Sequence, residues 1–265
     1  MSQGRSVPPR ELSLHPALGL LVAVLGIAAM RLVVPIFARD LPLRLLFMVS
    51  EMTLALPALL ALLWTSRPLS KTLALRPIDR PTALLAAGLG LALWLASLGL
   101  LELQYTVWPP PPGYLEIFRR IHEALRPANA FDAAVSVLTI AAAPAIFEEI
   151  LVRGVVLPSW QRAFGALGAL YASTILFAVM HFDLYRLLFT LAVGSVLGVV
   201  RLRAGALLPC MLVHGTLNTL TFLVAPLVDD PSEPLPDPRP LLGAALLALG
   251  MAATALLLRR LPRDR

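Results

Sequence analysis

Residues 135–160 read VSVLTIAAAPAIFEEILVRGVVLPSW, an apolar stretch that is interrupted by Glu148, Glu149 and Arg153. A transmembrane helix needs about 20 mainly apolar residues, so this stretch is long enough to span a bilayer. Ionisable groups at that depth cost about 2.5–3.5 kcal/mol each on insertion scales, and they persist mainly where they pair or take part in chemistry. Glu149 and Arg153 are four residues apart and share one face of a helix. The stretch therefore predicts a membrane-spanning helix that carries functional polar residues.

The rest of the chain has the same apolar character. Of its 265 residues, 58% are hydrophobic and 14% are charged, whereas about a quarter of the residues of a soluble domain are charged. Apolar windows of about 20 residues predict spans at 16–37, 42–64, 82–104, 135–160, 166–183, 184–202, 205–228 and 240–258. We therefore expect an all-α fold, a polytopic membrane helical bundle with about eight transmembrane helices.

A proline-rich segment separates the third and fourth predicted spans. Residues 108–113 read WPPPPG and cannot continue a helix. In the segment that follows, apolar residues recur at three- and four-residue steps, opposite charged ones. This pattern predicts one amphipathic helix that lies at the membrane surface, where it could gate or guide a substrate.

These segments predict four parts of the chain. Residues 1–104 form N-terminal transmembrane helices, and residues 105–130 form the proline-rich linker and the interfacial helix. Residues 131–228 form a catalytic core, and residues 229–265 form a loop and the last transmembrane helix.

The charges of the chain bear on its orientation and its partners. With eight spans, 13 of the 22 Lys and Arg residues lie on the side of both termini and seven lie on the other side, which predicts cytoplasmic termini. The net charge of +6 comes without basic runs interleaved with aromatic residues, so nucleic-acid binding is not expected. The single cysteine, Cys210, excludes an intrachain disulfide. We expect the lipid bilayer to surround the protein, and the arginine-rich composition favours a bacterial inner membrane.

Further polar residues occur in the later spans. His181 ends the fifth span, and His214 and Asn218 share one face of the seventh. Glu148 and His181 lie at similar distances from the turn at residues 161–168, roughly 24 Å along two antiparallel helices. We expect these side chains to meet at one depth in the bundle.

Three ordered motifs, FEEILVRG at 147–154, FAVMH at 177–181 and HGTLN at 214–218, carry a family resemblance. In order and spacing they resemble the CPBP intramembrane proteases, which include the CAAX prenyl endopeptidases and the bacterial bacteriocin-processing and self-immunity proteins. The resemblance covers residues 131–225, about one third of the chain. It implies a glutamate-type endopeptidase that acts on a membrane-anchored protein or peptide.

The resemblance also implies roles for single residues. Glu148 and His181 activate a water molecule, while His214 and Asn218 donate hydrogen bonds to the developing oxyanion. Glu149 and Arg153 form a supporting ion pair. The resemblance is compatible with three kinds of substrate: a prenylated C-terminal motif, a bacteriocin leader and a C-terminal sorting tag. No residue of the chain favours one of them over the others.

A zinc-dependent version of the same protease is the alternative for the cofactor. His181, His214 and one glutamate would provide a catalytic zinc set, with the other glutamate as the base. We expect no metal cofactor, because a helical His-Glu-x-x-His motif is absent from the sequence and the resemblance favours a glutamate site.

Two other classes of protein fit the buried polar residues. A proton-coupled transporter would relay protons through them, but it predicts repeated halves, which the sequence lacks. A non-catalytic scaffold or immunity factor would use them to bind partner helices.

Glu51 in the second span has two interpretations: it pairs with Arg31 or faces water. Cys210 is expected to be a small buried residue.

Overall fold

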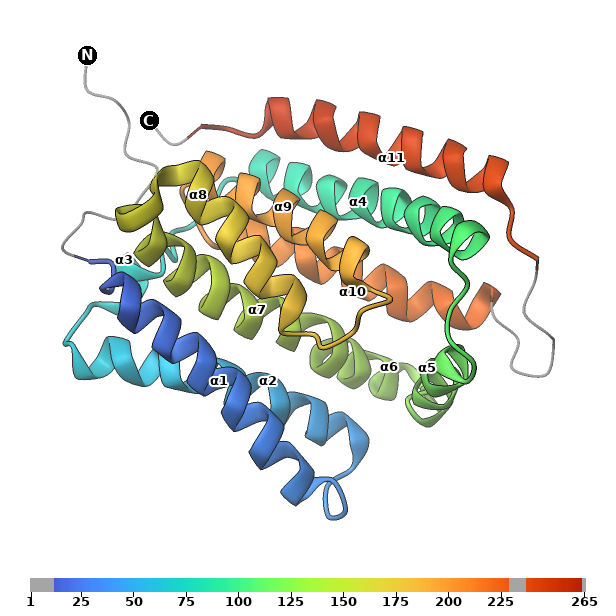
Figure 1. The fold of residues 1–265 in the computed structure, drawn as a ribbon, viewed down its shortest axis with the longest axis horizontal. Helices are drawn as coiled ribbons and strands as arrows, with labels where there is room; N and C mark the ends of the chain where they lie inside the picture. Colours follow the sequence, from blue (N-terminus) through green and yellow to red (C-terminus); the bar gives the residue numbers. More distant parts are fainter. Residues whose placement is uncertain (1–11, 229–236, 264–265) are drawn as a thin grey trace.

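The computed structural model describes residues 12–228 and 237–263, with side chains as far as residue 224 in the first range. Within these ranges the chain is helical and forms no strand. The helices (Figure 1) are α1 (Pro16–Phe37), α2 (Leu43–Trp64), α3 (Leu69–Thr72), α4 (Arg80–Val107), α5 (Tyr114–Ala124), α6 (Ala130–Ser136), η1 (Val137–Ala142), α7 (Ala143–Glu149), η2 (Ile150–Val156), α8 (Leu157–Val179), α9 (Leu187–Ala204), α10 (Leu208–Val228) and α11 (Pro240–Arg260).

The helices confirm the predicted membrane bundle. Six stretches are long and apolar enough to cross a membrane, and α10 adds a shorter apolar helix. The longest stretch, Ala130–Val179, contains Gly165, whose φ of 69° and ψ of −179° are not helical. Figure 1 shows the chain turning back there, so α8 packs against η2 as the second arm of a hairpin. In the described residues the chain therefore passes through the bundle eight times.

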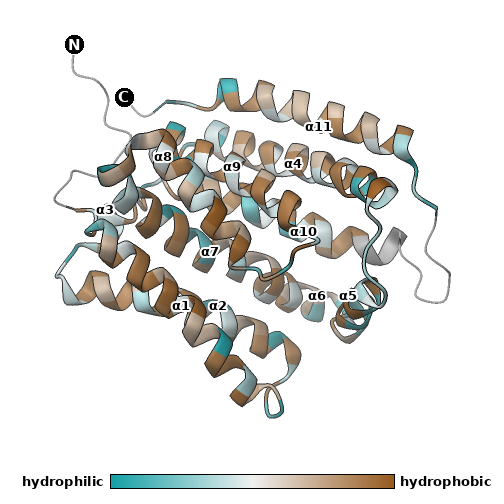
Figure 2. Cartoon of the chain, in the orientation of Figure 1, coloured by the Kyte–Doolittle hydropathy of each residue, from teal (hydrophilic) through white to brown (hydrophobic). Residues whose placement is uncertain are grey.

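Figure 2 colours most of α1 brown and much of α11 in paler brown, so both helices consist largely of apolar residues. Leu32, Leu241 and Leu249 are among the large apolar side chains that remain exposed there. Exposed apolar surface on this scale marks an interaction site in a soluble protein, and on a bundle of spanning helices it matches contact with lipid tails.

Several hydrogen bonds gather the ends of helices on one side of the bundle. Trp160 donates to the carbonyl of Pro16 at the start of α1 (3.3 Å), and Arg162 donates to the carbonyl of Ser13 (3.4 Å). At the end of α11, Arg203 donates to the carbonyls of Leu261 (2.9 Å) and Arg259 (2.7 Å). The start of α1 and the end of α11 thus lie beside arginine-bearing turns.

The predicted amphipathic helix is α5, which has no buried residue. Its first residue, Tyr114, donates a hydrogen bond to Asp183 (2.6 Å), and Asp183 also accepts from the backbone N–H of Arg186. Burial and then the Asp183 carboxyl raise the pKa of Tyr114 above its usual value, so the phenol remains a donor. This bond ties α5 to the turn that follows His181.

Two π-helical segments flank α7, the short helix that carries both glutamates. Pro144 has no backbone N–H to donate, and η1 lies just before it, with the N–H of Ala143 bonded to the carbonyl of Leu138, five residues back. In η2 the N–H of Leu157 bonds to the carbonyl of Val152 in the same way. Such wide turns rotate the side chains that follow and are frequent at functional sites.

Candidate active site

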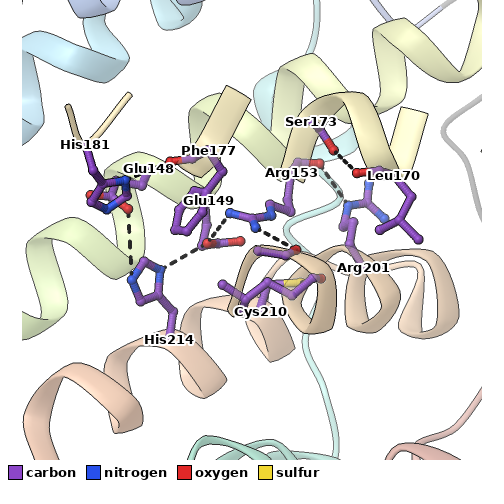
Figure 3. Close-up of polar contacts among 12 residues, drawn as sticks. Glu148, Glu149, Arg153, Leu170, Ser173, Phe177, His181, Arg201, Cys210 and His214 are labelled. Carbon is purple, nitrogen blue, oxygen red and sulfur yellow. Dashed lines mark hydrogen bonds and ion pairs between the residues drawn. The ribbon is translucent and has the colours of Figure 1, made fainter. Parts of the chain in front are cut away.

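Glu149 lies at the centre of a buried polar cluster on α7, η2, α8, α9 and α10 (Figure 3). Its Oε1 accepts a hydrogen bond from Nη1 of Arg153 at 2.8 Å and lies 3.0 Å from Nδ1 of His214. The side chains of Glu149 and Arg153 are 0% and 1% exposed. The predicted ion pair is present, and it also contacts one of the predicted oxyanion donors.

Glu148 faces the other nitrogen of the same imidazole. Its Oε2 lies 3.9 Å from Nε2 of His214, beyond hydrogen-bond length, and this oxygen is buried without a hydrogen-bond partner in the described chain. The two adjacent glutamates therefore lie against opposite nitrogens of His214. Glu149 is bonded to Arg153 and His214 through Oε1, while its Oε2 has no hydrogen-bond partner, whereas Glu148 forms no hydrogen bond with a described residue.

The hydrogen bonds also define the tautomers of the two histidines. Nδ1 of His181 lies 2.7 Å from the carbonyl of Phe177, and a carbonyl only accepts, so Nδ1 carries hydrogen and Nε2 is left as an acceptor. Nδ1 of His214 faces the Arg153-paired carboxylate of Glu149 and is likewise a donor. Neutral His181 can thus accept a proton at Nε2, whereas His214 donates from Nε2 only as an imidazolium.

Phe177 brings the histidines and the guanidinium together. Its ring centroid lies 5.0 Å from that of His181, 5.9 Å from that of His214, and 4.2 Å from Cζ of Arg153. In the structure its ring and its carbonyl hold both imidazoles at one place, so Glu148, His181 and His214 belong to one cluster.

Asn218 lies one turn beyond His214 on α10 and is half-buried. Its side-chain amide forms no hydrogen bond with another described residue. The amide therefore has free N–H groups on the helix that presents His214.

Two residues of α9 complete the support of Arg153, and neither was predicted as a site residue. Gly194 accepts a hydrogen bond from Nη2 of Arg153 at 3.0 Å, and Arg201, 1% exposed, donates to the carbonyl of Arg153 at 3.1 Å. A Cβ at Gly194 would lie 3.1 Å from the ring of Phe177 and 3.5 Å from Nη2. The glycine lets α9 approach the guanidinium closely.

The structure also decides between the interpretations of Glu51. Glu51 is 9% exposed and α2 packs against α7, so it does not face water. Arg31 does not pair with it: the guanidinium of Arg31 lies over the ring of Phe182, 4.6 Å from the centroid. Cys210 is fully buried, as expected.

The described residues contain no group of three or more His, Cys, Asp and Glu side chains placed to hold a metal ion. His214 uses Nδ1 to bond Glu149, and His181 uses Nδ1 to bond the Phe177 carbonyl. Both Nε2 atoms stay free in this arrangement, so the choice between the metal-free site and the zinc alternative stays a prediction.

Comparison with known proteins supports the same part of the chain. Residues 130–220 match the Rce1-like family, described as type II CAAX prenyl endopeptidase Rce1-like. No curated protein and no solved structure matches the chain. The matched segment runs from the start of α6 into α10 and contains every residue of the polar cluster. Over residues 130–220 the chain is therefore similar to this protease family, which agrees with the resemblance carried by the three motifs.

Proposed function

We propose that the protein is an intramembrane endopeptidase that uses Glu148 and His181 to activate water against a peptide bond of a membrane-anchored protein or peptide. The observation that carries this proposal is the contrast between the two glutamates. Glu149 accepts a hydrogen bond from Arg153 and contacts His214 through Oε1, whereas the buried carboxyl group of Glu148 forms no hydrogen bond with any described residue. An unpaired buried carboxylate is costly unless it performs chemistry.

The first step is deprotonation of water. The free Nε2 of His181 and the free oxygen of Glu148 are both acceptors, so a water between them can lose its proton as its oxygen attacks the peptide carbonyl. The dry surroundings strengthen this electrostatic assistance.

The second step is stabilisation of the oxyanion. An imidazolium at His214 is compatible with its two carboxylate neighbours, at 3.0 Å and 3.9 Å, and its Nε2–H would be free to donate because the Glu148 contact is longer than a hydrogen bond. The amide of Asn218 would provide a second donor. Donors of this kind each contribute about 2.7–4 kcal/mol to transition-state stabilisation. The proposed mechanism uses no metal ion.

We also propose that the protein lies in a bacterial inner membrane with both termini on the cytoplasmic side. The grouping of Arg162, Arg203 and Arg259 near the start of α1 and the end of α11 supports this side. Fusions after Arg263 test it: green fluorescent protein should fluoresce and alkaline phosphatase should be inactive. Active phosphatase with a dark fluorescent fusion would reverse the orientation.

The experiment on function uses the purified protein in phospholipid vesicles with a library of peptides, each anchored by one transmembrane helix and followed by a randomised segment. Mass spectrometry of the products should reveal new termini with the wild type and none with Glu148→Gln. Glu123→Gln, on the exposed face of α5, is the matched control and should cleave like the wild type. Equal products from Glu148→Gln and the wild type would contradict the proposal.

A further inference from the structure

Glu51 is a buried carboxyl group that the mechanism above does not use. It belongs to α2, which lies outside the segment matched by the protease family and packs against α7 and both π-helical segments. Its Oε2 is inaccessible and has no hydrogen-bond partner in the described chain, and the group interacts electrostatically with Glu148. Helix α2 therefore brings a third carboxyl group close to Glu148, beside the candidate active site.

No cation pairs with Glu51 in the described part of the chain. Arg31, on the neighbouring helix α1, stacks on Phe182. Arg153 is bonded to Glu149 and to the carbonyl of Gly194. The carboxyl group thus has an acidic neighbour and lacks a basic one.

The balance of charge decides its protonation. The other buried guanidinium, that of Arg201, bonds to the carbonyl of Arg153 and lies on the far side of Arg153 from Glu148 (Figure 3). Three carboxylates would therefore stand against the guanidinium of Arg153 and one imidazolium at His214, which leaves one negative charge without a neighbouring positive charge. An unpaired buried ion carries a penalty of several kcal/mol, and a carboxyl group avoids it by holding a proton. Glu149 faces Arg153 and Glu148 faces His214, so the proton belongs on Glu51. A protonated carboxyl group is a donor.

Building on the proposed function, we infer that Glu51 is a catalytic acid that protonates the leaving amine. Water gives one proton to Glu148 and its oxygen bonds to the peptide carbon, which forms the tetrahedral oxyanion. The C–N bond then breaks as its electron pair takes the proton of Glu51. Glu148 returns its proton to Glu51, and the products are a carboxylic acid and an amine. One water is consumed and both carboxyl groups regain their starting states.

The test compares substrates that differ in the need for a proton on the leaving group. A cleaved membrane-anchored peptide is prepared with its scissile amide intact and with that amide replaced by an activated aryl ester, whose phenolate leaves unprotonated. Glu51→Gln keeps the size and neutrality of the protonated side chain but cannot release a proton. For the amide we expect kcat to fall about 100-fold or more with KM little changed, and for the ester we expect kcat to change less than about threefold.

Two further variants make the outcomes distinguishable. Glu102→Gln changes a carboxyl group of α4 that faces α11, near Gly243, and should leave both substrates unaffected. Glu148→Gln should abolish hydrolysis of the amide. If Glu148→Gln is inactive but Glu51→Gln slows amide and ester equally, or slows neither, the role of Glu51 is refuted while the protease mechanism stands. If Glu148→Gln still cleaves the amide, the mechanism itself fails and the role of Glu51 fails with it.

Discussion

Nδ1 of His214 lies 3.0 Å from Oε1 of Glu149, a contact between residues 65 positions apart in the chain. The same oxygen accepts the hydrogen bond of Arg153. Glu149 therefore joins α7, η2 and α10 and fixes the tautomer of an imidazole that also faces Glu148. Glu149, which was predicted only as half of a supporting ion pair, thus also positions an imidazole of the candidate active site.

Removal of Arg153 should destabilise the bundle strongly. Arg153→Met leaves Glu149 buried and unpaired, so we expect the free energy of unfolding in detergent to fall by about 3–5 kcal/mol. Adding Glu149→Gln removes the stranded charge and should restore part of this loss. Arg120→Met breaks the exposed pair with Glu116 (2.9 Å) and should cost less than about 0.5 kcal/mol. A loss for Arg153→Met no greater than for Arg120→Met would contradict the importance of the buried pair.

Much of the fold could be predicted from the sequence, because hydrophobic length alone identifies spanning helices. The predicted span 16–37 coincides with α1, and the turn predicted at 161–168 contains Gly165. The π-helical segments were not predictable, since one extra residue in a turn leaves the apolar pattern almost unchanged. Pro144 lacks a backbone N–H, but this alone does not specify a π-helical turn.

The candidate site was predictable only in part. Four-residue spacing revealed the Glu149–Arg153 pair, which is local. The contacts of Arg153 with Gly194 and Arg201 join segments more than 40 residues apart, and a glycine carbonyl has no signature in the sequence. The sequence identifies Glu51 as a charged residue within a predicted span, but its proximity to Glu148 depends on the packing of α2 against α7.

A methyl group at Gly194 should disturb the site without unfolding the protein. In Gly194→Ala the new Cβ meets the Phe177 ring at 3.1 Å and Thr174 at 3.3 Å, so the ring, over which the Arg153 guanidinium lies, must shift by a few tenths of an ångström. We expect kcat to fall roughly tenfold or more, since small misplacements of catalytic groups can be costly. The control is Gly88→Ala, whose Cβ meets only Leu257 at 3.5 Å. Equal activity of the two variants would show that close approach at Gly194 is unimportant.

The bond between Tyr114 and Asp183 should hold α5 in place. Tyr114→Phe removes the donor, so amide hydrogen exchange in residues 114–124 should become faster. In the wild type the pKa of Tyr114 is raised above 10.0 by burial and by Asp183, so the contribution of the phenol is fully present below pH 10 and is lost only as the pH rises through the folded-state value. Protection should therefore persist at pH 9. Unchanged exchange in Tyr114→Phe would contradict the anchoring role.

Metal chelation provides a separate prediction. Because the described residues contain no group of three or more His, Cys, Asp and Glu side chains placed to hold a metal ion, we expect cleavage in vesicles to continue in a strong zinc chelator. Elemental analysis should find less than about 0.1 zinc per chain, well below the one ion that a catalytic zinc site holds. Stoichiometric zinc together with loss of activity on chelation would establish the zinc alternative.

The most direct test of the central claim is the cleavage rate constant of the wild type, Glu148→Gln, His181→Gln and the double variant on one membrane-anchored peptide. If Glu148 and His181 act together on one water, each single variant should lose about 100-fold to 10,000-fold in kcat. The double variant should then be hardly slower than either single one. Single variants that cleave at the wild-type rate would contradict the account.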